Sequence, residues 1–72
     1  MPIETIAQIL ASAREDAGLS QSAAARSCGV ARQAIHRWER GLLVPSLDHV
    51  AALARAYGLT PAELVARVYP EA

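Results

Sequence analysis

Four glycines constrain this chain more than any other feature, because each follows a stretch in which apolar residues recur with helical spacing. They are Gly18, Gly29, Gly41 and Gly58. Glycine is favoured just after a helix, where the backbone often turns into a left-handed conformation. The spacing therefore predicts short helices joined by short turns, and no strands.

We expect five helices, each with apolar residues at intervals of three and four that form one buried face. Their expected ranges are about Ile3–Ala17, Gln21–Cys28, Ala31–Arg40, Ser46–Tyr57 and Thr60–Tyr69. In the fourth, Leu47 and Val50 are among the residues expected to line the buried side. With 72 residues, of which 53% are hydrophobic, the chain predicts a single all-α domain over residues 1–72.

Most of the expected helices begin at a residue that can cap them. Ser20 and Ser46 precede the second and fourth helices, and Thr60 with Glu63 forms a capping box for the fifth. Ala31, at the start of the third helix, has no side-chain oxygen, which costs about 1 kcal/mol relative to Ser or Thr. Gly29 and Val30 make the second and third helices a helix-turn-helix pair.

The third helix has two unlike faces. One arc is mainly apolar and carries the only Trp; its residues are Ala31, Ala34, Ile35, Trp38 and Glu39. The other arc, called the outer face below, holds three guanidinium groups and no carboxylate; its residues are Arg32, Gln33, His36, Arg37 and Arg40. This pattern predicts a helix held by a core on one side that presents its other side to a polyanion.

The charge is unevenly distributed although the net charge is zero. Residues 21–41 contain four Arg and one Glu, a net charge of +3, and the rest of the chain contains three Arg and six acidic residues. A basic patch on an otherwise acidic chain is typical of nucleic-acid binding.

Composition argues against several other classes of protein. No apolar run is long enough to cross a membrane, and Met1–Leu10 lacks the basic start of a signal peptide. The single cysteine, Cys28, suits a reducing cytoplasm. Cys28, His36 and His49 lack metal-ligand spacing, and no catalytic arrangement is evident. We therefore expect no metal, no cofactor and no enzyme activity.

Taken together, these residues resemble the lambda-repressor-like, Cro/Xre-type helix-turn-helix family over about Ile6–Val68. The matching residues are Arg14, Gly18-Leu19-Ser20-Gln21, Ala25, Gly29-Val30, Ile35, Trp38-Glu39-Arg40-Gly41, Pro45, Leu53-Ala54, Tyr57-Gly58-Leu59 and Glu63-Leu64. The resemblance implies a five-helix DNA-binding domain, usually dimeric and often a repressor. The single cysteine favours a cytoplasmic protein, and the Ala- and Arg-rich composition favours a bacterial or phage origin. The chain departs from the family at Ala24 and Cys28, where Leu is common, at Ala31, where Ser or Thr is usual, and in having no Lys.

The resemblance places the DNA contacts on and beside the third helix. We expect Arg32 and Gln33, with His36 and Arg37 one turn on, to read bases in the major groove. The expected phosphate-binding residues are Gln21, Ser22, Arg40 and Gly41. The alternative for each is an ordinary solvated side chain.

One inward-facing residue of the third helix is charged. A lone carboxylate at Glu39 would be costly to bury, and Arg14, at the rim of the apolar stripe of the first helix, is its natural partner. The family carries the same pair as a partly buried salt bridge. We therefore assign both residues a structural role.

The expected partner is double-stranded DNA with a palindromic operator, bound by a homodimer. We expect the dimer to form through the C-terminal helix, with Val65, Val68 and Tyr69, although these residues could instead complete the core. Leu42–Val44 is the other candidate interface. An alternative function is a protein-interaction module that binds an antagonist or toxin, or bridges a transcription complex.

Overall fold

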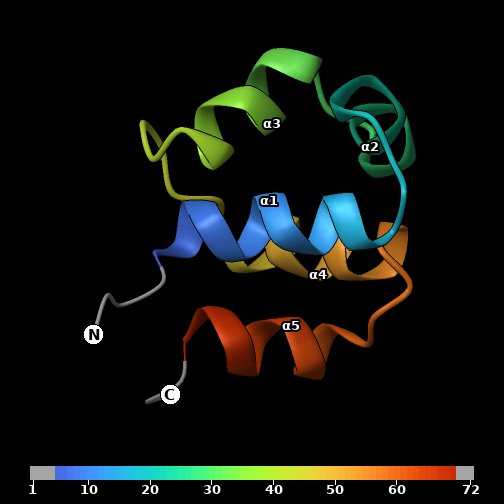
Figure 1. The fold of residues 1–72 in the computed structure, drawn as a ribbon. Coiled ribbons are helices and arrows are strands. Elements are labelled where there is room, and N and C mark those ends of the chain that lie inside the picture. The colour runs from blue at the N-terminus through green and yellow to red at the C-terminus, as the bar shows by residue number, and fades with distance from the viewer. Residues whose placement is uncertain (1–4, 70–72) are drawn as a thin grey trace.

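The computed structural model describes residues 5–69, and within that range it contains five α-helices and no strands (Figure 1). They are α1 (Ile6–Asp16), α2 (Gln21–Cys28), α3 (Arg32–Glu39), α4 (Leu47–Ala56) and α5 (Pro61–Val68). The all-α prediction and the number of helices are confirmed. Over the same residues, none of the helices has the length and apolar character needed to cross a membrane.

The helices surround one apolar core. Figure 1 shows α2 and α3 together on one side of α1, with α5 on the opposite side of the molecule. Helix α4 packs against α2 and α5, and α1 packs against α3 and α5. The largest fully buried side chains are Leu10, Ile35, Val50, Leu53 and Leu64. They come from four helices, so α3 is held by the same core that joins α1, α4 and α5.

Helix α1 begins later than predicted. The expected start at Ile3 lies outside the described residues, and Thr5 has extended backbone, so the helix begins at Ile6. Thr5 Oγ1 accepts from the Gln8 amide at 3.1 Å, and Gln8 Oε1 accepts from the Thr5 amide at 2.9 Å. This capping box was not recognised in the sequence, because Thr5 was placed inside the helix.

The turn between α2 and α3 is set by Gly29 and Val30. Gly29 adopts a left-handed conformation with φ 70°, and the Val30 amide donates to the Ala25 carbonyl at 3.0 Å. The Val30 side chain is half-buried against the core. Small side chains at Ala24 and Ala25 are buried in α2, which allows close packing against α3 and α4. The turn thus fixes how α3 is presented.

One expectation about apolar residues needs correction. Leu47 is 61% exposed, because it lies in the first turn of α4, beyond the buried stripe that begins at Val50. In α5, Leu64 and Val68 are buried in the core, whereas Val65 is half-buried. The C-terminal helix therefore places Leu64 and Val68 in the core, and the expected dimer contact through this helix stays a prediction.

Candidate nucleic-acid interface

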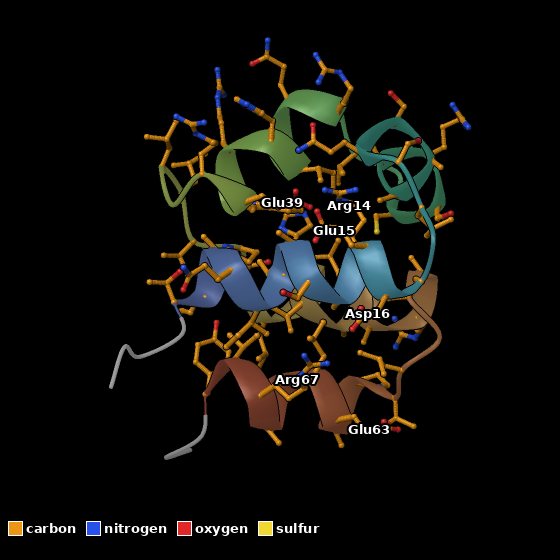
Figure 2. The ribbon with its side chains drawn as sticks, in the orientation of Figure 1. Arg14, Glu15, Asp16, Glu39, Glu63 and Arg67 are labelled. Atoms are coloured by element: carbon orange, nitrogen blue, oxygen red, sulfur yellow. The ribbon has the colours of Figure 1, made fainter. Side chains whose placement is uncertain are left out.

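Helix α3 has the two faces that its sequence predicts. Ile35 and Trp38 are only 1% and 6% exposed and anchor the helix in the core. The outer-face residues Arg32, Gln33, His36, Arg37 and Arg40 are all exposed. Figure 2 shows nitrogen-tipped side chains standing away from the body of the molecule along α3. The proposed base-reading residues therefore form one solvent-facing surface.

The residues expected to bind phosphate lie near both ends of that surface. Gln21 and Ser22 begin α2; Ser22 is exposed and Gln21 is half-buried. Gln21 Oε1 lies 3.4 Å from Arg32 Nη1, so the start of α2 adjoins the start of α3. Arg40 and Gly41, both exposed, follow the last residue of α3. The structure thus gathers all eight candidate DNA-contacting residues on and around α3.

Glu39 and Arg14 fix the inner side of α3 to α1. Arg14 Nε donates to Glu39 Oε2 at 2.7 Å, and Arg14 Nη2 donates to Oε1 at 2.9 Å. Figure 2 shows the two side chains pointing toward each other between the helices. Their side chains are 13% and 7% exposed, and the hydrogen bond to Glu39 raises the pKa of Arg14. Arg14 Nη1 also donates to the Leu19 carbonyl at 2.9 Å, which ties in the turn before α2.

Gln21 extends this ion pair toward the outer face. Its Nε2 donates to Glu39 Oε1 at 3.1 Å, and its Oε1 accepts from Arg32 Nη1. A continuous chain of polar contacts therefore runs from Arg14 through Glu39 and Gln21 to Arg32. Sequence reasoning missed the contact between Gln21 and Glu39. The sequence did carry a signal for this contact, because a carboxylate such as Glu39 can accept more hydrogen bonds than one arginine donates to it.

The C-terminal half of α3 is held by a different contact. The rings of Trp38 and His49 lie with centroids 4.9 Å apart at an interplanar angle of 43°. His49 Nδ1 is 3.0 Å from Ser46 Oγ, which also accepts from the His49 amide at 3.2 Å. The N-terminal turn of α4 is thereby packed against Trp38. His49 is itself exposed, and helical periodicity alone does not reveal its contact with Trp38.

The electrostatics of this surface follow from these contacts. Glu39 is the only acidic residue between positions 21 and 41, and Arg14 neutralises it on the inner side. The guanidinium groups of Arg32, Arg37 and Arg40 face solvent without an acidic neighbour on their own face. The outer face is therefore positive although the whole chain is neutral.

The residues considered as metal ligands do not form a site. Within residues 5–69, no three His, Cys, Asp or Glu side chains are grouped closely enough to hold an ion. Cys28 is a free, half-buried thiol that packs against the core, and burial raises its pKa. A raised thiol pKa opposes formation of the thiolate that metals and electrophiles require.

Comparison with known proteins agrees with this geometry. A family model described as a helix-turn-helix domain matches residues 5–67, which is nearly the whole chain. No significant match was found among curated proteins.

Proposed function

Because this chain belongs to the family of helix-turn-helix domains, which are DNA-binding domains, we propose that it regulates transcription by binding a specific sequence in double-stranded DNA. The observation that carries the proposal is the exposed outer face of α3, which is positive and is anchored from behind by Ile35 and Trp38. The major groove of DNA admits one α-helix of this kind.

The start of α3 supplies the best base-reading side chains. In helix-turn-helix proteins the N-terminal residues of the second helix meet base edges. Arg32 suits O6 and N7 of guanine, and Gln33 suits N6 and N7 of adenine. His36 and Arg37 lie one helical turn further along the same exposed face and extend the reading surface.

Phosphate contacts would hold α3 in register from both sides. The first backbone amides of α2, beside Gln21 and Ser22, point out of a helix N-terminus and attract anions. Arg40 and Gly41 offer a guanidinium group and an exposed backbone at the far end of α3. Such contacts fix orientation and carry no sequence information by themselves.

The regulatory output that we propose is repression from a palindromic operator. Two copies related by a two-fold axis would place their reading helices about 34–36 Å apart, one turn of DNA. Occupancy of that operator would exclude other proteins from the same DNA. The resemblance to Cro/Xre-type repressors supports this reading.

The decisive experiment is selection of bound sequences from a random duplex pool, followed by titration with salt. We expect an enriched palindrome, and a log-log plot of binding constant against salt with a slope of about −0.9 for each phosphate contacted. Arg32→Ala should weaken binding by about 1–3 kcal/mol and relax specificity at one base pair. Arg67→Ala is the matched control, because Arg67 lies on α5, on the opposite side of the molecule from α3 (Figure 2).

The rival function is a protein-interaction module, which the neutral net charge keeps open. A module of that kind would enrich no sequence from the random duplex pool. Arg32→Ala would then abolish a protein complex and leave the affinity for DNA unchanged. An unenriched pool would therefore contradict the proposal.

A further inference from the structure

A hollow lies between the first turn of α1, the end of α3 and the segment that follows α3. We call it the α1–α3 hollow. Its volume is about 360 Å³, at the lower end of the range of small-molecule sites. Its lining residues are Thr5, Ile6, Ala7, Trp38, Arg40, Gly41, Leu43 and Val44. Most of this lining is hydrophobic, and only Arg40 and Gly41 belong to the proposed DNA surface.

The apolar lining of the hollow is held by the core on one side and faces water on the other. Trp38 is anchored in the core and only 6% exposed. Gly41 lies close to α1, because a Cβ added to it would be 3.9 Å from that of Ala7. Leu43 and Val44, by contrast, are 52% and 68% exposed. An apolar ligand in the hollow would therefore cover hydrophobic surface that is now in contact with water.

One charged group lines this apolar hollow. Arg40 is exposed, and no acidic side chain within residues 5–69 forms an ion pair with it. A guanidinium group can bind a carboxylate through two parallel hydrogen bonds. Ligand sites commonly combine hydrophobic walls with a few polar groups that fix the orientation of the ligand. The hollow thus fits a small molecule with an apolar body and one carboxylate.

A second hollow on the surface has a different lining. Its volume is about 490 Å³, and it is lined by Ser27, Ala52, Arg55 and Ala56. It also has an arginine, but it has no large hydrophobic side chain to cover the body of a ligand. An exposed ion pair alone contributes little to binding. The second hollow is therefore a natural control for the first.

We propose that the α1–α3 hollow binds a small apolar carboxylic acid, and that the bound acid weakens binding of this chain to DNA. The second part rests on the proposed function, in which Arg40 and Gly41 contact phosphate at the far end of α3. A carboxylate paired with Arg40 cancels one positive charge there and occupies the guanidinium group that would bind phosphate. DNA must in turn weaken binding of the acid by the same factor, because coupling between two ligands is reciprocal.

Trp38 gives a direct readout of the site, because it is the only Trp in the chain and it lines the hollow. The probe is phenylacetate; phenylacetamide lacks its charge, and acetate lacks its apolar body. Phenylacetate should change the Trp fluorescence of the protein saturably at millimolar concentration, without DNA. Phenylacetamide should bind about five-fold more weakly, and acetate should give no saturable change. Equal binding of phenylacetamide, or no saturable change with phenylacetate, would overturn the proposal.

Two substitutions of alanine by methionine test where the probe binds. Ala7→Met fills the α1–α3 hollow, and Ala52→Met places the same side chain in the second hollow. Both alanines are half-buried, helical and outside the proposed DNA surface. Thermal melts establish that each variant is folded. Ala7→Met should abolish the fluorescence response to phenylacetate, and Ala52→Met should keep it; a full response in Ala7→Met would overturn the proposal.

Arg40→Gln tests the charge at an exposed position, where the substitution does not disturb the core. Its affinity for phenylacetate should fall about five-fold, to that for phenylacetamide. A continued preference for phenylacetate over phenylacetamide in this variant would show that Arg40 does not bind the carboxylate, and would overturn the proposal.

The effect on DNA is measured with the duplex recovered by selection. Saturating phenylacetate should weaken DNA binding by about five-fold and lower the salt slope by about 0.9, the share of one phosphate. Acetate at the same concentration matches the ionic strength and should have no such effect. Ala7→Met should bind this duplex as the wild type does and should not respond to phenylacetate.

The two proposals fail separately in this experiment. DNA affinity that is unchanged by saturating phenylacetate would overturn the inference, while salt-dependent binding to the selected duplex would still support the proposed function. Absence of DNA binding by the wild type would refute the proposed function, and the fluorescence titrations would still decide whether the hollow binds the acid.

Discussion

Arg14 and Glu39 form a two-pronged ion pair across 25 positions of the chain, with Nε at 2.7 Å from Oε2 and Nη2 at 2.9 Å from Oε1. The pair joins α1 to the last residue of α3. Because both side chains are largely buried, the orientation of the outer face of α3 depends on a contact that lies behind it.

Replacing Glu39 by Ala should destabilise the fold by about 3 kcal/mol, because Arg14 would stay largely buried without its charged partner. The measurement is the free energy of unfolding in urea. Glu15→Ala is a matched control, since Glu15 is an exposed carboxylate next to Arg14 in sequence, and we expect a change within about 0.5 kcal/mol. Equal stability of the two variants would show that the ion pair contributes little.

Gln21→Glu should lower stability by about 2 kcal/mol, since it replaces an amide donor 3.1 Å from Glu39 Oε1 with a second carboxylate. Gln33→Glu adds the same charge at an exposed position of α3 and should leave stability nearly unchanged. Thermal melts of both variants at neutral pH provide the measurement. A Gln21→Glu protein as stable as Gln33→Glu would contradict the network.

The helices were predictable because glycine positions, capping residues and apolar spacing agree along most of the chain. Local chemistry alone gave the right helix boundaries at two places. One is the end of α2, at Gly29 and Val30, and the other is the start of α5, at the capping box of Thr60 and Glu63. The start of α1 was predicted wrongly because apolar spacing continues before Thr5, whereas the cap decides where the helix begins.

The outer face of α3 was also predictable, because helical periodicity alone separates Arg32 from Ile35. The contact of Gln21 with Glu39 and the tilted contact between the rings of Trp38 and His49 were not predictable, since each joins different helices. Helix periodicity places residues on a face but does not fix how two helices cross. The exposure of Leu47 likewise depends on where the first turn of α4 ends relative to the core.

Ala31→Ser should stabilise the protein by about 1 kcal/mol, because the N-cap of α3 has no side-chain hydrogen bond. Ala31 already has φ −71° and ψ 148°, close to the values at the capping residue Ser20, so a hydroxyl can reach the Ala34 amide, which now donates to the Ala31 carbonyl at 3.0 Å, without a backbone change. The melting temperature should rise by about 4–8 °C. Ser20→Ala should lower it by a similar amount. An unchanged melting temperature for Ala31→Ser would show that the Ala31 carbonyl already satisfies the Ala34 amide well enough.

Tyr57 should make the fold sensitive to alkaline pH. Burial, and then the negative charge of Glu39, raise the pKa of its phenol, so the folded state favours the neutral form. In the unfolded chain a tyrosine ionises near pH 10. Its contribution to stability is therefore complete below about pH 10 and is lost as the pH rises above that value toward its folded pKa.

Tyr57→Phe removes the ionising group and should make the alkaline loss of stability shallower, while unfolding near pH 7 changes little. Urea unfolding of both proteins from pH 8 to pH 11 measures the difference. Burial also raises the pKa of Cys28, but this thiol is present in both proteins and cancels in the comparison. Tyr69→Phe removes a half-buried phenol and should keep the wild-type decline. Parallel stability curves for the wild type and Tyr57→Phe would mean that another group causes the alkaline unfolding, because only the substituted phenol distinguishes the two chains.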